Sequence, residues 1–197
     1  MNLETHVETI AQWLDAADVD AAPSRIADAL AHNAVRESSG NYARATYGEI
    51  LKGAYHEAAH SAVAHVFGLR AGRVCVRSDA SGSSAYEFDQ ADLDSMQAAT
   101  VAHLAGVALE LIFCAAGEDP QRRFALRNSA DILNARCDAD ACRALAPSLN
   151  LTNRTFAVLA VSAVISNMDA IERIAGALQA SGELAGGAVE ALCGQLQ

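Results

Sequence analysis

Two histidines and a glutamate with the spacing His-Glu-x-x-His are the residues of this sequence best suited to do chemistry. They are His56, Glu57 and His60, within a segment of helical pattern. On a helix the side chains at i and i+4 lie one above the other, so His56 and His60 point in the same direction. Two imidazoles placed in this way can bind one zinc ion, and the glutamate beside them can reach a water molecule on that metal. The pattern therefore predicts a zinc-dependent peptidase site in which Glu57 activates a zinc-bound water.

Such a zinc site needs a third protein ligand, and spacing alone leaves two candidates open. Glu110 is a carboxylate in an otherwise apolar segment, where an unpaired charge is costly to bury, so we expect it to have a metal, cationic or hydrogen-bonding partner. Asp131 follows a polar stretch at the start of an expected helix, where the helix dipole alone also favours an acidic residue. His65 turns well away from the face of His56 and His60, and we expect it to be a packing or hydrogen-bonded histidine.

The segments around the motif predict the elements that position it. We expect the motif helix to run from about Thr46 to Phe67, with Gly68 as a left-handed cap. The alternating residues 73–77, a loop over 78–84 and a returning strand over 85–88 predict a hairpin, the only convincing β signal in the sequence. This hairpin either accepts an extended substrate as an added strand or only closes the fold, and the sequence leaves both open.

Helical periodicity predicts that most other segments are helices. The nearly all-apolar segment 96–115, with Asp92 or Asp94 as its N-cap, is expected to be the central helix. The other expected helices lie, in chain order, at about 3–14, 23–35, from 128, 155–167, 169–180 and 183–196. The predicted fold is mainly α, a helical bundle with a small β-hairpin or sheet beside the motif helix. We expect a single domain over 1–197, with extra N-terminal helices at 1–45, the metal-site core at 46–141 and C-terminal helices at 142–197.

Composition excludes several classes of function. Hydrophobic residues make up 52% of the chain and aromatic residues only 5%, with alanine prominent, which favours helices in close contact. The net charge of −10 argues against a nucleic-acid partner, because phosphate binding needs a basic face. The single lysine, Lys52, is followed by Gly53, so no phosphate-binding loop of the G-x-x-x-x-G-K-[ST] type is present and no ATPase activity is expected.

Targeting and redox patterns predict a cytoplasmic protein. Residues 1–5 have neither a basic nor an apolar signal region, so no secretory signal is expected. The apolar windows 98–116 and 156–165 fail as membrane spans, because the first carries His103 and Glu110 and the second is too short. The five cysteines, an odd number at irregular spacing without C-x-x-C, are expected to be reduced thiols, many of them buried.

The order of these segments resembles the protease domain of the FtsH family (peptidase family M41). That family shows His-Glu-Ala-Gly-His, a Leu-x-Gly-Arg-x-Ala-Glu-Glu helix and an Asn-Asp-Leu or Asn-Asp-Ile segment whose aspartate is the third zinc ligand. The resemblance covers about 47–141 and continues more weakly through 168–192. The residues that carry it here are His56-Glu57-Ala58-Ala59-His60, the hairpin, Leu104-Ala105-Gly106-Val107-Ala108-Leu109-Glu110 and Ser129-Ala130-Asp131-Ile132.

The resemblance implies a zincin-like fold and a set of roles. His56, His60 and Asp131 would bind Zn²⁺, Glu57 would be the general base, and Glu110 would hold a ligand histidine in place. The implied activity is that of a zinc metalloendopeptidase acting on short peptides or unfolded proteins. The family forms hexameric rings, so a homo-oligomer stays open here, as does an unfoldase acting in trans.

The sequence also departs from the family pattern. Ala59 replaces the motif glycine, Val107 the arginine, Leu111 the second glutamate and Ala130 the asparagine. The membrane segments and AAA ATPase domain of the family are missing, which implies a free-standing, diverged relative. Two alternatives to the peptidase therefore stand: a catalytically weak or inactive scaffold used for binding or regulation, and a plain helical interaction protein whose motif histidines are only hydrogen-bonded.

Overall fold

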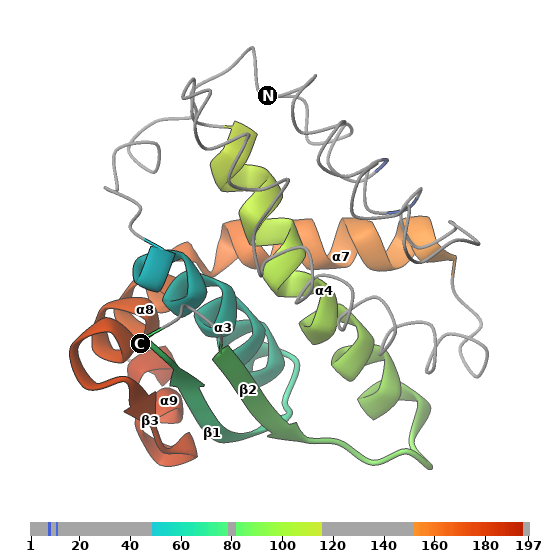
Figure 1. The fold of residues 1–197 in the computed structure, drawn as a ribbon. Helices are drawn as coiled ribbons and strands as arrows, with labels where there is room; N and C mark the ends of the chain where they lie inside the picture. Colours follow the sequence, from blue (N-terminus) through green and yellow to red (C-terminus); the bar gives the residue numbers. More distant parts are fainter. Residues whose placement is uncertain (1–7, 9–10, 12–48, 79–81, 116–151, 195–197) are drawn as a thin grey trace.

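The computed structural model describes residues 49–78, 82–115 and 152–194, together with Glu8 and Ala11. The described part is mainly helical with one small antiparallel sheet, which confirms the predicted class (Figure 1). Helix α3 lies between the sheet on one side and α4 and α7 on the other, and its most extensive contacts are with α4 and α8. The elements are α3 (Glu49–Val66), β1 (Arg70–Val76), β2 (Gly82–Glu87), α4 (Leu93–Ala115), α7 (Asn153–Ser166), α8 (Met168–Ser181), β3 (Glu183–Leu184) and α9 (Gly186–Cys193).

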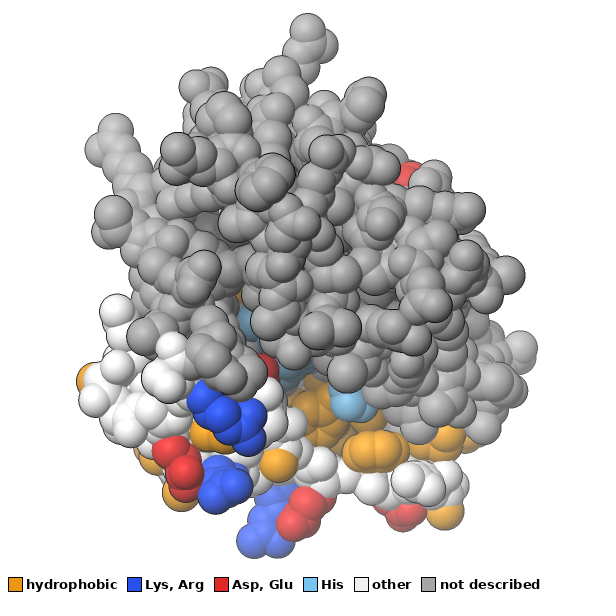
Figure 2. Space-filling model, in the orientation of Figure 1, with side chains coloured by type: hydrophobic (Ala, Val, Ile, Leu, Met, Phe, Trp, Pro, Cys, Tyr) orange, Lys and Arg blue, Asp and Glu red, His pale blue; other side chains and the backbone are white. Residues whose placement is uncertain are grey.

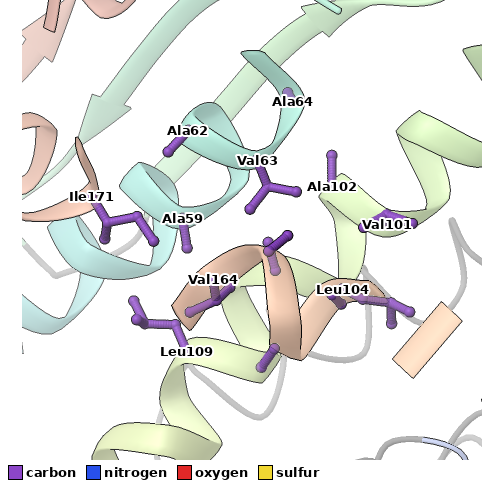
Figure 3. Packing of buried hydrophobic residues seen from close by; sticks show 14 of the residues in the cluster. Ala59, Ala62, Val63, Ala64, Val101, Ala102, Leu104, Leu109, Val164 and Ile171 are labelled. Carbon is purple, nitrogen blue, oxygen red and sulfur yellow. The ribbon is translucent and has the colours of Figure 1, made fainter. Parts of the chain in front are cut away.

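Small side chains let the helices of the core pack closely. Val63 of α3 points toward Ala102 of α4, and Val164 of α7 and Ile171 of α8 belong to the same cluster (Figure 3). Alanine combines high helix propensity with a side chain that lets two backbones approach. The alanine-rich composition therefore has the packing role that we predicted from it.

The motif helix ends where the sequence predicts. The described part of α3 starts at Glu49, and its last residue is Val66. Gly68 has a φ of 80°, and its N–H donates to the carbonyl of His65 at 2.9 Å, which confirms the left-handed cap. Only glycine adopts this conformation without strain, so the residue fixes the turn from α3 into β1.

The hairpin is longer than predicted. Strand β1 pairs antiparallel with β2, with Val74 opposite Ser84. The prediction of a loop through residue 84 is wrong, because β2 already begins at Gly82. The residues Gly82-Ser83-Ser84 have turn-like composition, but pairing with β1 and contact with α3 hold them as strand.

Helix α4 is central, as predicted, and starts slightly earlier. Its N-cap is Asp92, whose Oδ2 accepts a hydrogen bond from the N–H of Ser95 at 3.0 Å. Of the two candidate caps, the structure therefore selects Asp92. The side chains described along α4 from Ala98 to Leu109 are buried, with the exception of the partly exposed His103.

The C-terminal helical pair is confirmed as α7 and α8, but the following segment was predicted wrongly. Residues Glu183–Leu184 form β3, which pairs with β1, and the last helix begins only at Gly186. Gly182, with a φ of 74°, ends α8, and its carbonyl accepts a hydrogen bond from the N–H of Val76. A strand of two residues depends entirely on its partner strand, so local sequence does not reveal it.

The described residues test several other predictions only in part. The helices expected before residue 46 and from 128 lie outside the described residues, apart from Glu8 and Ala11, which are helical. Cys75 and Cys193 are free thiols, as expected, but both are partly exposed rather than buried. Of the described helices, none alone is long and apolar enough to cross a membrane, and α7 and α8 pass that test only as a pair bent by 73°.

Candidate metal centre

The two motif histidines converge inside the protein. His56 and His60 lie one turn apart on α3 and are only 3% and 5% exposed. Their Nε2 atoms are 2.9 Å apart, and the rings are close to perpendicular, at 77°. At this distance the two nitrogens share a hydrogen bond. Two nitrogens bound to one tetrahedral zinc lie about 3.3 Å apart, so the pair would have to separate slightly and give up this hydrogen bond to become two ligands of one ion.

A backbone carbonyl of α4 fixes the protonation of His60. The Nδ1 atom of His60 lies 2.7 Å from the carbonyl oxygen of Ala102. Since a carbonyl oxygen only accepts hydrogen bonds, Nδ1 carries a proton, and in the neutral ring Nε2 then presents a lone pair. Zinc-bound histidines are commonly oriented by a hydrogen bond of this kind from the second ring nitrogen. The Ala102 carbonyl therefore leaves Nε2 as the nitrogen of His60 that could bind a metal.

A glycine of α4 leaves the space in which the two rings meet. A Cβ atom added to Gly106 would lie 2.5 Å from Cε1 of His56 and 2.6 Å from Nε2 of both His56 and His60. Real Cβ atoms essentially never come this close to other heavy atoms, and both rings are buried, so a side chain here would displace them. Glycine in a helix interior lowers helix stability by about 1 kcal/mol relative to alanine. The lack of room for a Cβ atom beside the two nitrogens explains why a glycine stands here.

Replacing Gly106 with alanine is therefore expected to weaken zinc binding strongly while leaving most of the fold intact. The added methyl group enters the point where the two Nε2 atoms converge, and the rings must separate. Displacement of ligands is expected to cost at least the roughly 10- to 100-fold in metal affinity that loss of a supporting hydrogen bond costs. Zinc affinity measured by competition with a chelating dye tests this. Gly176→Ala on α8, where an added Cβ meets nothing within 4 Å, is the matched control.

Glu57 points from α3 toward the sheet. It is buried, at 4% exposed, and a Cβ added to Gly82 would lie 2.6 Å from its Oε1. One turn further on, the hydroxyl of Ser61 hydrogen-bonds that of Ser84 at 2.7 Å. The inner face of β2 therefore runs along α3 beside the histidine pair, and the missing side chain at Gly82 makes room for the carboxylate.

The structure brings together only part of the predicted ligand set. Asp131 lies outside the described residues, and Glu110 lies within α4 with its side chain outside them. Within the described ranges no group of three or more His, Cys, Asp or Glu residues could hold a metal ion. His65, in the last turn of α3, is partly exposed. The described part of the site thus consists of His56, Glu57 and His60 with the α4 and β2 residues around them.

Sequence reasoning did not identify the residues of α4 and β2 that shape this site. Gly106 and Gly82 were treated as family matches or loop residues, although an isolated glycine inside an apolar helix is itself a signal of close approach. The carbonyl of Ala102 had no sequence signal, because a backbone atom is placed by packing alone. In the sequence His103 only argues against a membrane span, whereas the structure pairs it with Tyr86 at 2.8 Å (Nδ1 to Oη).

Two ionisable groups among the described residues, Cys193 and Tyr55, have raised pKa values. Burial raises the pKa of the Cys193 thiol; Arg173 opposes this shift and Glu190 adds to it. Burial also raises the pKa of the Tyr55 phenol, and the negative charge of Glu172 adds to the shift. Both groups therefore stay protonated near neutral pH.

On the face shown in Figure 2, histidine side chains (pale blue) lie next to hydrophobic ones (orange).

No protein-family model and no curated protein matches this sequence.

Proposed function

We propose that this protein is a zinc-dependent metallopeptidase that hydrolyses peptide bonds in short or unfolded polypeptides. The observation that carries the proposal is the meeting of the His56 and His60 Nε2 atoms in front of Gly106, with Nδ1 of His60 held by Ala102. In the structure the two Nε2 atoms share one hydrogen bond, in which His60, protonated at Nδ1, accepts from His56, and a zinc ion would replace that hydrogen bond. Glu57, the next residue on α3, then stands in the position of a general base.

Zinc would need a ligand beyond the described residues, among which no group of three or more could hold a metal ion. His56 and His60 would offer two nitrogens, and by its resemblance to the FtsH-like proteases the chain would complete the set with Asp131. Glu110 would hold a ligand histidine by a hydrogen bond. Bound zinc supplies a Lewis acid that polarises the scissile carbonyl and lowers the pKa of a water molecule toward about 7.

Glu57 moves the proton in this reaction. Its carboxylate takes a proton from the attacking water as the water oxygen bonds to the carbonyl carbon. The proton then passes to the leaving nitrogen as the C–N bond breaks, so a carboxyl and an amine are released. The fixed position of the carboxylate against Gly82 supports this role, because a buried base at a set place needs no reorganisation.

The sheet supports a peptide as the substrate. In the described part of the chain the strand order is β2-β1-β3, which leaves β2 at an edge. An extended peptide added to this edge would make main-chain hydrogen bonds and run past Glu57. The alternative stated above, a hairpin that only closes the fold, predicts no such pairing.

Zinc content and peptide turnover together test the proposal. We expect the purified chain to hold one zinc ion and to cleave casein and a fluorogenic peptide library. Cleavage should be lost with a chelator and should return when zinc is added back. A chain with stoichiometric zinc but no cleavage would instead be a binding or regulatory scaffold. A chain that takes up no zinc would contradict the metal centre itself.

A further inference from the structure

Strand β2 meets the motif helix through alternate residues of its inner face. Gly82 lies against the carboxyl group of Glu57, because a Cβ atom added to this glycine would be 2.6 Å from Oε1 and 2.8 Å from Cδ. Two residues further along the strand, Oγ of Ser84 lies 2.7 Å from Oγ of Ser61. Alternate residues of a strand point to the same side, so both contacts belong to one face of β2. The strand therefore touches α3 at the candidate base and again at a pair of hydroxyls.

The spacing of these two contacts is the same on the strand and on the helix. From Gly82 to Ser84 a strand advances about 6.6 Å, at about 3.3 Å per residue. From Glu57 to Ser61 a helix advances about 6 Å, at about 1.5 Å per residue, and the two side chains lie on the same face. Because the two advances match, the hydroxyl pair fixes which residue of β2 stands opposite Glu57. A shift of the strand by two residues would place Ser84 there, where even a Cβ atom has no room.

Burial of the helix hydroxyl strengthens this constraint. Ser61 is only 4% exposed, whereas Ser84 is partly exposed. A buried hydroxyl left without a hydrogen-bond partner destabilises a protein more than a typical hydrogen bond stabilises it. The position of β2 that brings Ser84 to Ser61 is therefore favoured over positions that do not.

The candidate ligands and the candidate base are positioned by separate elements. His56 and His60 approach α4, where the Ala102 carbonyl accepts the hydrogen bond of His60. Glu57 and Ser61, each one residue further along α3, approach β2 instead. A movement of β2 would therefore change the place of the base without changing that of the histidine pair.

We propose that Ser61 and Ser84 are positioning residues of the peptidase reaction. Their hydrogen bond keeps β2 against Glu57 and so holds the carboxylate where it accepts the proton of the attacking water. The inference rests on the proposed peptidase function. In this role neither serine touches the substrate, and no bond to either hydroxyl oxygen forms or breaks. Loss of position acts on the chemical step, so the effect falls on kcat.

Kinetics of the zinc-loaded full chain test the assignment. Ser84→Ala is expected to lower kcat about 10-fold at unchanged zinc content, less than the roughly 10²-fold that a misplacement of about 1 Å can cause. Ser61→Ala should cause a similar loss. The double variant should be no slower than the slower single variant, because either substitution removes the same hydrogen bond.

The neighbouring serine of β2 provides the matched control. Ser83 is exposed on the opposite face of the strand, and its Oγ lies 3.2 Å from Sγ of Cys75. Ser83→Ala should therefore keep the kcat of the wild type.

A double-mutant cycle with Glu57 separates positioning from a general loss of structure. In the Glu57→Gln background, Ser84→Ala should change the residual kcat by less than about twofold, because the hydrogen bond acts through a carboxylate that is no longer there. A general loss of structure would lower both rates by the same factor.

Gly82→Ala tests the same position without touching either hydroxyl. Its methyl group enters the space of the Glu57 carboxyl group and displaces it directly. This variant should lower kcat at least as far as Ser84→Ala does, while its zinc content stays that of the wild type.

The possible results distinguish the inference from the proposed function. If Ser84→Ala and Gly82→Ala keep the kcat of the wild type while Glu57→Gln loses activity, the positioning role is wrong and the peptidase stands. If Ser84→Ala lowers kcat by the same factor in the wild type and in Glu57→Gln, the hydroxyl pair does not act through the base, and the inference is wrong. If the zinc-loaded wild type cleaves nothing, the proposed function fails and the inference fails with it.

Discussion

Replacing Glu57 with glutamine is expected to lower kcat for peptide hydrolysis by about 10²- to 10⁴-fold while zinc content stays unchanged. Glutamine has the same shape as glutamate and fits against Gly82, but its amide cannot accept the proton of the attacking water. His56 and His60, the candidate ligands, are untouched, so metal affinity should not fall. Initial rates on a fluorogenic peptide, with zinc measured on the same samples, give both quantities.

The control for Glu57→Gln is Glu87→Gln on the same sheet. Glu87 is exposed on β2 and pairs with Arg70 at 3.4 Å, an interaction of little energetic weight at the surface. This variant should keep wild-type rates. Full activity of Glu57→Gln at normal zinc content would mean that another group is the base.

The second large effect concerns the ligand set. His60→Ala and Asp131→Ala are each expected to reduce zinc affinity by more than the roughly 10- to 100-fold associated with residues behind a metal ligand. Glu110→Gln is expected to fall within that smaller range, because we assign Glu110 to hold a ligand histidine. Competition with a chelating dye on the purified variants ranks all three.

Asp169→Ala serves as the control for this series, since Asp169 is an exposed acidic residue in the first turn of α8. It should bind zinc as tightly as the wild type. If Glu110→Gln loses the metal while Asp131→Ala keeps it, the third ligand is Glu110 and the resemblance to FtsH-like proteases misassigns these residues. Equal and small losses of zinc affinity for both variants would mean that neither Glu110 nor Asp131 is the third ligand.

Much of the described fold could be predicted because its signals are local. Gly68 marked the end of α3 through the conformation that only glycine adopts without strain, and Asp92 marked the start of α4 through its side-chain cap. The errors fall where contacts between distant segments override composition. Gly82 and Ser84 are strand residues because β1 and α3 hold them, and Glu183 is a strand residue because it pairs with Cys75 of β1.

In the candidate site, too, only the residues with a local sequence signal could be predicted. His56, Glu57 and His60 could be read from their spacing, because one helix places all three. The Ala102 carbonyl, the Gly106 surface and the Ser84 hydroxyl come from a second helix and a strand, and only packing brings them to the motif. The candidate ligands Asp131 and Glu110 stay predictions.

One turn of α4 both orients the His60 ring and leaves room for it. In an α-helix the Ala102 carbonyl faces the N–H of Gly106, and here the same carbonyl also accepts the proton of His60 Nδ1. A slide of α4 along α3 by one residue would break the histidine contact and bring a Cβ atom against the rings at the same time. The packing of α3 against α4 therefore favours this one register of the two helices.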